Sequence, residues 1–375
     1  VGSEMCIRDR GVMVGHDNLL SNVRFVHECE GNDADCVSVS WLPAFHDMGL
    51  VEGILTPAYG GFSAYLMSPL AFVQRPARWL RAVSRFRATN SGGPNFAYQY
   101  CTQTVTEAQR EELDLRAWRT AYNGSEPVRK ETMERFNAAF RTCGFRPEAF
   151  CPVYGLAEST ALVSASSIAR EPIIRSFNEI LDGRSISVEE KSGDKGRTLV
   201  GCGEIDPRAA VRIVDPESGS LCRPDVEGEI WLSGPSVAKG YWDDPVETSR
   251  VFEGFISDTG EGPFLRTGDL GLISNAQLFV TGRIKDVIIT RGRKLYPQDI
   301  EFSVTCANPL VRHHGVAAFS VEDGVSESVV VMAELDSRRL RKMDRDAPVR
   351  VAAVEDPAYL REIARDIVET VARDY

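Results

Sequence analysis

The stretch that decides the fold is residues 37–67, VSVSWLPAFHDMGLVEGILTPAYGGFSAYLM. Within it, residues 37–42 and residues 62–67 each predict a strand. The pattern between them predicts a helix that begins near His46. A strand, a helix and a second strand in succession favour parallel strands with a helix packed against the sheet.

The same alternation continues along the chain. The sequence predicts helices over residues 76–86 and 127–143, the second with Pro at its first turn, and strands over residues 88–91 and 117–122. We therefore expect an α/β fold, in which the large domain has parallel-type sheets with flanking helices. Such sheets place functional groups in the loops after strand ends. Asn123-Gly124-Ser125 and Tyr154-Gly155 occupy such positions.

After residue 199 the pattern changes to short strands separated by Gly, Pro and Asp turns, which predicts a small β-rich subdomain over about 199–284. A small α+β domain is expected over 285–375, with a hinge at about Lys285. The expected strands of both parts are residues 211–214, 229–232, 278–280, 287–290, 316–319 and 329–334, and the tail helices begin at Pro297 and Pro357. Trp231 and Trp242 are expected to pack in the β-rich part.

Two segments fit this scheme poorly. Residues 1–10 show no periodicity and resemble the translated read-through of a sequencing adapter, so we expect the large domain to be residues 11–284. Residues 164–197 are long, mixed in polarity and highly charged near residues 189–195. A segment of this kind is either functional or disordered, and local chemistry leaves both readings open.

Composition limits the classes of function. The 375 residues carry a net charge of -11, which argues against nucleic acid as the main partner. No apolar run reaches the length of a membrane span. The nine cysteines are scattered and contain no CxxC pair, which predicts reduced thiols and a cytoplasmic location rather than disulfides or a zinc site.

Two separated motifs suggest a nucleotide site. In Leu265-Arg266-Thr267-Gly268-Asp269-Leu270-Gly271, an aspartate at a Gly-bounded turn could accept both ribose hydroxyls, and Arg283 downstream could donate to the sugar or its phosphate. A capped turn is the alternative for the first motif. Residues 153–160 offer the ring of Tyr154 for a base and Gly155 for close backbone approach. They also offer hydroxyls at Ser159 and Thr160 for phosphate, and the Glu158 carboxylate for a metal.

With these residues in view, the chain resembles the adenylate-forming superfamily of acyl ligases, and within it the fatty acyl-AMP ligases. Blocks at residues 40–50, 153–160, 265–271 and 282–301 carry the resemblance, and residues 67–76 and 91–98 look like the fatty acyl-AMP branch. That branch is known for an insertion in the large domain, and residues 164–197 are the candidate for it. The insertion is thought to hinder coenzyme A thiolation, so that the acyl group passes to a carrier protein.

The resemblance implies ATP and Mg²⁺ as cofactors and a fatty acid as substrate, with acyl-AMP and pyrophosphate as products. An acyl carrier protein, or a carrier domain of a polyketide or peptide synthase, would accept the acyl group. Glu158 would bind magnesium and Tyr154 would stack on adenine opposite Gly124 and Ser125. The other implied contacts are Gly155, Ser159, Thr160, Asp269 and Arg283 to the nucleotide, His46 to the acyl carboxylate, and Lys285 at the hinge. A packing role for His46 and a plain surface charge for Lys285 are the alternatives.

The chain also departs from the family pattern. The Ser/Thr/Gly-rich phosphate loop is represented only by Gly11-Val12-Met13-Val14, and the family's catalytic lysine would lie beyond Tyr375. We therefore expect a fragment that is itself inactive and whose sheet has an uncovered edge or face. The alternatives for function are a fatty acyl-CoA ligase and a non-catalytic module that binds a nucleotide or a carrier.

Overall fold

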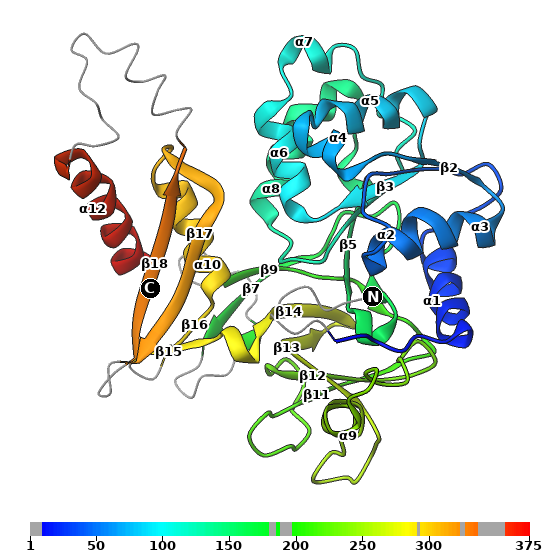
Figure 1. Ribbon diagram of the computed structural model, residues 1–375, viewed down its shortest axis with the longest axis vertical. Helices are drawn as coiled ribbons and strands as arrows, with labels where there is room; N and C mark the ends of the chain where they lie inside the picture. The colour runs from blue at the N-terminus through cyan, green and yellow to red at the C-terminus, as the bar shows by residue number, and fades with distance from the viewer. Residues whose placement is uncertain (1–9, 180–184, 188–196, 291–292, 323–326, 337–356) are drawn as a thin grey trace. The chain divides into compact units, whose positions relative to one another are not determined.

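The computed structural model describes residues 10–179, 185–187, 197–290, 293–322, 327–336 and 357–375. The chain divides into two compact units, Val1–Thr281 and Gly282–Tyr375, each with its own hydrophobic core (Figure 1). The residues resembling adapter sequence lie outside the described part, except Arg10.

A seven-stranded sheet forms the centre of the first unit, in the order β10-β6-β5-β4-β3-β1-β2. The neighbours from β2 to β5 run parallel, whereas β6 is antiparallel to both β5 and β10. This mixed, mostly parallel sheet with flanking helices confirms the expected α/β class. Its strands are β1 Val37–Ser40, β2 Ser63–Leu66, β3 Asn90–Gly93, β4 Thr120–Asn123, β5 Phe150–Gly155, β6 Leu162–Ala165 and β10 Glu204–Ile205.

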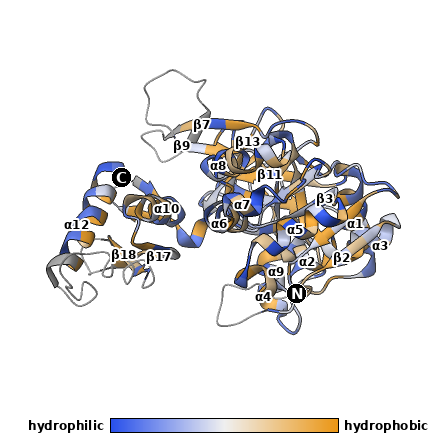
Figure 2. Ribbon diagram, turned by 90° about the horizontal axis from the view of Figure 1, so that it is seen from above, coloured by the Kyte–Doolittle hydropathy of each residue, from blue (hydrophilic) through white to orange (hydrophobic). Residues whose placement is uncertain are grey.

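Helices cover both faces of this sheet. Neighbouring residues of a strand point to opposite faces, so each strand contributes to a core on either side. Ala121 and Phe150 belong to one hydrophobic core, whereas Tyr122 and Cys151 belong to another. Figure 2 shows hydrophobic residues concentrated inside this unit. The first core is closed by α4 Pro69–Gln74, α5 Ala77–Phe86, α6 Asn95–Thr104 and α8 Lys130–Phe140. The second core is closed by α1 His16–Cys29, α2 Asp47–Leu50 and the π-helix Val51–Leu55. The short helices α3 Thr56–Gly60 and α7 Glu107–Arg110 and the 3-10 turns Arg141–Cys143 and Pro147–Ala149 also lie before residue 150.

Two small antiparallel sheets follow. One lies after residue 199, where short strands are expected, and the other is formed mostly by residues before it. One has the order β11-β12-β13-β14 and the other β8-β7-β9. The second sheet is built largely from the segment 164–197, of which residues 180–184 and 188–196 lie outside the described residues. The elements are β7 Ile174–Glu179, β8 Ser185–Ser187, β9 Arg197–Val200, β11 Ala210–Val214, β12 Gly228–Ser233, α9 Pro245–Phe252, β13 Leu265–Ser274 and β14 Gln277–Arg283.

Two local expectations in this part are wrong. The motif at residues 265–271, expected as a turn, lies inside the long strand β13. Trp231 is buried as expected, but Trp242 has 74% of its surface exposed. Neighbouring residues of an extended segment face opposite sides, and here it is Tyr241 that packs into the core.

In the described part of the second unit, the chain forms two antiparallel strand pairs, two α-helices and the 3-10 turn Ile284–Asp286. Its elements are β15 Ile288–Thr290, β16 Arg293–Leu295, α10 Pro297–Ala307, β17 Val311–Glu322, β18 Glu327–Leu335 and α12 Pro357–Asp374. Ile300 and Val304 of α10 are buried in its core, and Ile367 and Val371 of α12 pack against the same core. Figure 2 shows both hydrophilic and hydrophobic residues along α12, as expected for a helix with one buried side.

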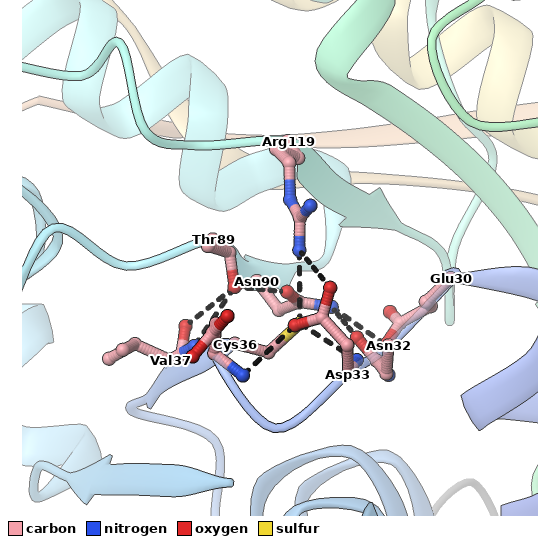
Figure 3. Close-up of polar contacts among 9 residues, drawn as sticks. Glu30, Asn32, Asp33, Cys36, Val37, Thr89, Asn90 and Arg119 are labelled. Carbon is pink, nitrogen blue, oxygen red and sulfur yellow. Dashed lines mark hydrogen bonds and ion pairs between the residues drawn. The ribbon is translucent and has the colours of Figure 1, made fainter.

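A polar network lies where β1, β3 and β4 begin, at the amino edge of the large sheet (Figure 3). Glu30 follows α1, and its carboxylate accepts hydrogen bonds from the side-chain amides of Asn32, at 2.8 Å, and Asn90, at 2.9 Å. The Arg119 guanidinium donates to the Cys36 thiol at 3.0 Å and lies 4.0 Å from the Asp33 carboxylate. These contacts fix the loop between α1 and β1.

Two buried acidic groups, Glu30 and Glu52, lie near each other. Burial raises the pKa of Glu30 to about 7. Burial also raises the pKa of Glu52 well above its usual value, and the nearby Glu30 raises it further. Both carboxyls therefore favour the protonated form more strongly than exposed carboxyls do.

The described cysteines are free thiols. Cys101 and Cys151 are buried, and this burial raises the pKa of both thiols. Thiols in such surroundings are chemically inert, because the thiolate is the reactive form. Among the described residues, no helix combines the length and apolar character needed to cross a membrane.

Candidate nucleotide site

The carboxyl edge of the large sheet brings together the first group of predicted residues. β4 and β5 are parallel neighbours, with Asn123 opposite Pro152. Gly124 and Ser125 therefore begin the loop after β4 at the edge where Tyr154 and Gly155 end β5. A Cβ on Gly124 would lie 2.6 Å from a Val153 methyl carbon, so the close approach of these strands requires glycine there.

Asp269 reaches the same place from a different sheet. The Tyr154 hydroxyl donates a hydrogen bond of 2.8 Å to Oδ2 of Asp269, across a separation of 115 residues. Both side chains are buried. The structure thus joins two residues that the sequence predicts to hold the base and the ribose of one nucleotide.

Asp269 owes its position to an irregularity in β13. The pairing of β12 with β13 changes register between Glu229 and Trp231, and Gly268 has a φ of 70°. The Gly268 N–H donates to the Glu229 carboxylate at 3.1 Å, and the Asp269 N–H donates to the Thr267 hydroxyl at 3.0 Å. Such a bulge re-aims side chains within a strand. Glu229, which the sequence analysis did not single out, is a buried support of this arrangement.

The turn after β5 is tightly built. Gly155 has no room for a side chain, because a Cβ would lie 1.7 Å from the carbonyl oxygen of Ala161. Thr160 has a φ of 70°, which is unusual for a β-branched residue, and it is buried. Its hydroxyl donates to the Ser236 carbonyl at 2.7 Å, so it would have to turn away from Ser236 to donate to a phosphate. Ser159 is also buried, and its contact with phosphate stays a prediction.

Glu158 is half-buried in this turn and has a partner that the sequence analysis missed. The Tyr241 hydroxyl donates to Oε1 of Glu158 at 2.8 Å. Burial and the neighbouring carboxylate raise the pKa of Tyr241, which keeps the phenol protonated and able to donate. The sequence signal for Tyr241 is its place in Lys239-Gly240-Tyr241-Trp242, next to the tryptophan that was expected to pack.

His46 begins α2, as the sequence predicts. Its Nδ1 lies 3.2 Å from the backbone nitrogen of Met48 and 2.7 Å from Oδ1 of Asp47. His46 therefore caps the helix, which is a structural role like the packing alternative. Its contact with an acyl carboxylate stays a prediction. An apolar groove of about 340 Å³ lies beside this segment, and it is lined by Leu42, Pro43, Ala44, Phe45, Gly49, Ile54, Leu66, Met67, Ser68 and Pro69.

Arg283 and Lys285 belong to the second unit. Arg283 ends β14, and Lys285 lies in the 3-10 turn Ile284–Asp286. Gly282 and Arg283 are therefore the last two residues of a strand. The roles of both residues at a nucleotide stay predictions.

Several features of the first unit fit a nucleotide. The Asn123 side chain is fully buried at the end of β4, and neither its amide nitrogen nor its amide oxygen has a hydrogen-bond partner among the described residues. Ser125 and Thr160, on the two neighbouring loops, both have positive φ, and such strain is typical of binding sites.

The chemistry of a metal at this site is also restricted. Within the described ranges, no three His, Cys, Asp or Glu side chains form a metal cluster. A lone carboxylate such as Glu158 suits Mg²⁺, which usually combines one or two carboxylates with phosphate oxygens and water.

Comparisons with known proteins agree with this geometry. Residues 8–242, more than half of the chain, match the family described as AMP-binding enzyme. The chain is 44% identical over 338 residues to the medium-chain-fatty-acid–[acyl-carrier-protein] ligase JamA of Moorena producens, covering 89% of this chain and 57% of that protein. It is 36% identical over 375 residues to the long-chain-fatty-acid–AMP ligase FadD26 of Mycobacterium marinum, covering 97% and 62%.

A solved structure is also similar to the chain. The crystal structure of the fatty acyl-adenylate ligase from L. pneumophila, in complex with acyl adenylate and pyrophosphate, is 39% identical with a TM-score of 0.74. The match covers all of this chain and 63% of that one, so the chain spans about three fifths of the length of these relatives. The chain belongs to the AMP-binding enzyme family, and within it to the fatty acyl-AMP ligase branch.

Proposed function

We propose that the whole protein activates a fatty acid with ATP, forming an acyl-adenylate and releasing pyrophosphate. The observation that carries the proposal is the hydrogen bond between Tyr154 and Asp269. This bond brings an aromatic ring and a carboxylate to one buried point, at the carboxyl edge where mostly parallel sheets bind nucleotides. Family membership supplies the reaction type.

In the proposed reaction, a carboxylate oxygen of the fatty acid attacks the α-phosphorus of ATP. An oxygen–phosphorus bond forms, and the bond to the leaving pyrophosphate breaks. Tyr154 would stack on adenine, with Gly124 and Ser125 opposite, and Asp269 would accept the ribose hydroxyls. The catalytic contribution of these residues is positioning.

Charge at the phosphates needs compensation as well. Glu158 would hold Mg²⁺, which supplies positive charge to the phosphate oxygens when bound. Ser159, Thr160 and Gly155 would border the phosphates, and Arg283 and Lys285 are the cations proposed to act on the nucleotide. Compensation of this kind in a water-poor site is usually the largest contribution to such catalysis.

The apolar groove beside His46 is the proposed site of the acyl chain. Its lining is almost entirely apolar, and about 340 Å³ lies at the small end of ligand-binding volumes. Relatives named medium-chain-fatty-acid–[acyl-carrier-protein] ligases, JamA and TtuA of Teredinibacter turnerae, are 44% and 40% identical to the chain. We therefore propose a medium-chain fatty acid as substrate and an acyl carrier protein as acceptor, with residues 164–197 as the branch-specific insertion.

The test is an assay of the whole protein, produced at the length of its relatives, with ATP, Mg²⁺ and fatty acids of increasing chain length. We expect pyrophosphate release, an acyl-AMP product, and transfer of the acyl group to a carrier protein. Absence of acyl-AMP with every chain length would refute the proposal. Efficient formation of acyl-coenzyme A would instead support the alternative, an acyl-CoA ligase. Repeating the assay on the chain of 375 residues tests the expectation that it is inactive by itself.

A further inference from the structure

Residues 236–241 are bonded to the turn that carries Glu158 at three points. The Ala238 N–H donates to the Glu158 carbonyl at 2.9 Å, and the Thr160 hydroxyl donates to the Ser236 carbonyl at 2.7 Å. The third bond runs from the Tyr241 hydroxyl to Oε1 of the Glu158 carboxylate, at 2.8 Å. The first two bonds hold the backbone of the turn, and only the third acts on the carboxylate.

The Tyr241 ring is itself held from several sides. It contacts the Phe252 ring edge-on, with 5.3 Å between centroids, and the Tyr241 N–H donates to the Thr248 hydroxyl at 2.9 Å. Gly240 has a φ of 124°, and a Cβ there would lie 2.3 Å from a Thr248 carbon. The chain therefore passes close to α9 just before the tyrosine, which leaves the ring little freedom. A phenol fixed in this way can fix the group it donates to.

The same segment is bonded to the start of the first unit. Met13 exchanges backbone hydrogen bonds with its partners, donating to the Gly240 carbonyl and accepting from the Lys239 N–H, both at 2.9 Å. The Trp242 N–H donates to the Gly11 carbonyl at 2.7 Å. Tyr241 thus forms an isolated antiparallel bridge with Val12, which belongs to the segment expected to represent the phosphate loop in this chain.

We propose that Tyr241 is a positioning residue for metal binding by Glu158. By donating to Oε1, the phenol fixes the orientation of the carboxylate and leaves the lone pairs of Oε2 for a divalent cation. Partners of this kind, which hydrogen-bond a metal ligand without touching the metal, commonly contribute tenfold or more to metal affinity. The inference rests on the proposed function, since it takes Glu158 as the ligand of the metal that accompanies ATP.

The experiment measures Mn²⁺ binding by electron paramagnetic resonance, in the whole protein saturated with α,β-methylene-ATP. We expect Tyr241→Phe to weaken Mn²⁺ binding roughly tenfold. Its affinity for the nucleotide in EDTA should stay within about twofold of the wild type, because the base and ribose contacts are unchanged. A tyrosine that only supported the fold would lower both affinities together.

Two further variants make the result decisive. Tyr100→Phe is the matched control, because it removes a phenol hydrogen bond of 3.0 Å to the Val73 carbonyl, and it should bind Mn²⁺ as the wild type does. Glu158→Asp keeps the charge but withdraws the carboxylate from the phenol, and it should lose Mn²⁺ affinity even if Tyr241→Phe fails to fold.

The possible failures are distinguishable. Unchanged Mn²⁺ affinity in Tyr241→Phe, alongside lost affinity in Glu158→Gln, would overturn the inference while leaving Glu158 as the ligand. Unchanged affinity in Glu158→Gln would remove the metal role of Glu158 from the proposed function, and the inference with it.

Discussion

At Asp269, one carboxylate oxygen already accepts the Tyr154 phenol, inside a buried site. Its carboxylate is the group proposed to accept the ribose hydroxyls. The Tyr154 hydroxyl is thereby committed to the protein, and the face of its ring is what it can offer to a base. These two residues would act on one nucleotide as a pair, not as independent contacts.

This pairing predicts unequal losses on mutation. Asp269→Asn should weaken ATP binding by roughly 1.5–3 kcal/mol, about tenfold or more, because it removes a charged acceptor. Tyr154→Phe keeps the ring and should weaken binding less, by roughly 1 kcal/mol. Isothermal titration of ATP into the whole protein measures both. Equal affinity in Asp269→Asn and wild type would exclude the ribose role.

Glu30 predicts a pH dependence of stability. Its folded pKa of about 7 lies above the ordinary value of 4.5, so the folded state binds more protons than the unfolded state between these values. Stability should therefore fall as pH rises from about 4.5 through 7. Glu30→Gln can still accept both asparagine hydrogen bonds but does not titrate. It should reduce the fall in the free energy of unfolding over this pH range by an amount on the order of 1 kcal/mol.

The measurement is urea unfolding of the chain at several pH values between 5 and 8. Glu28→Gln is the matched control, because Glu28 lies in the last turn of α1, just before Glu30. The Arg24 side chain lowers the pKa of Glu28, so its contribution is present above the ordinary pKa and lost on acidification. An unflattened profile in Glu30→Gln would contradict the assignment of this pH dependence to the buried carboxyl.

At the scale of elements, the sequence predicts most helices and strands of the large sheet, because each has a continuous period. The strand β13 escaped prediction for a definite reason. Leu265, Leu270 and Leu272 are buried, but the bulge at Gly268 shifts the alternation, and Thr267-Gly268-Asp269 has the composition of a turn. Local chemistry draws attention to Asp269, which the structure bonds to Tyr154, but it predicts the wrong backbone around that residue.

The site itself could be predicted only in part. Tyr154, Glu158 and Asp269 stand in recognisable motifs, whereas Tyr241 and Glu229 act through partners that are distant in sequence. Tyr241 lies 83 residues from Glu158, and no local pattern encodes that contact. Whether residues 164–197 are ordered could not be predicted for the same reason, since β7 and β9 are defined by pairing with each other.

The end of β5 gives a prediction for the element. Gly155→Ala should destabilise the chain by roughly 2–4 kcal/mol, because a Cβ would collide with the Ala161 carbonyl oxygen at 1.7 Å. Gly61→Ala is the control, because Gly61 has a φ of 69° and nothing within 4 Å of a Cβ. It should cost only about 1–2 kcal/mol. Comparable thermal unfolding midpoints for the two variants would show that the crowding at Gly155 is relieved by movement.

For the molecule as a whole, the edges of the large sheet differ. β2 is the last strand of the sheet, and all its residues are exposed. Tyr65 and Leu66 on this strand are 41% and 63% exposed, and Leu70 on the neighbouring helix is 62% exposed. An apolar edge strand of this kind is a template for pairing with another chain. The family pattern predicts an uncovered edge or face of the sheet, but composition alone does not locate it.

We therefore predict self-association of the chain through β2. Ala64→Lys places a charge on the exposed edge and should raise the concentration at which the chain stays monomeric, by roughly severalfold. Ala108→Lys makes the same substitution on the exposed helix α7, away from any sheet edge, and should change nothing. Light scattering across a concentration series measures both. Equal behaviour of the two variants would rule out β2 as the contact.

The turn after β5 also limits how these proteins can be recombined. It is bonded to Asp269 through Tyr154 and to the 236–241 segment through Glu158 and Thr160. A chimaera that takes only this short segment from a relative would therefore combine the relative's residues on one side of each hydrogen bond with this chain's residues on the other. Successful transplants should carry all three pieces together, and crossovers placed between them should yield enzymes with mismatched halves.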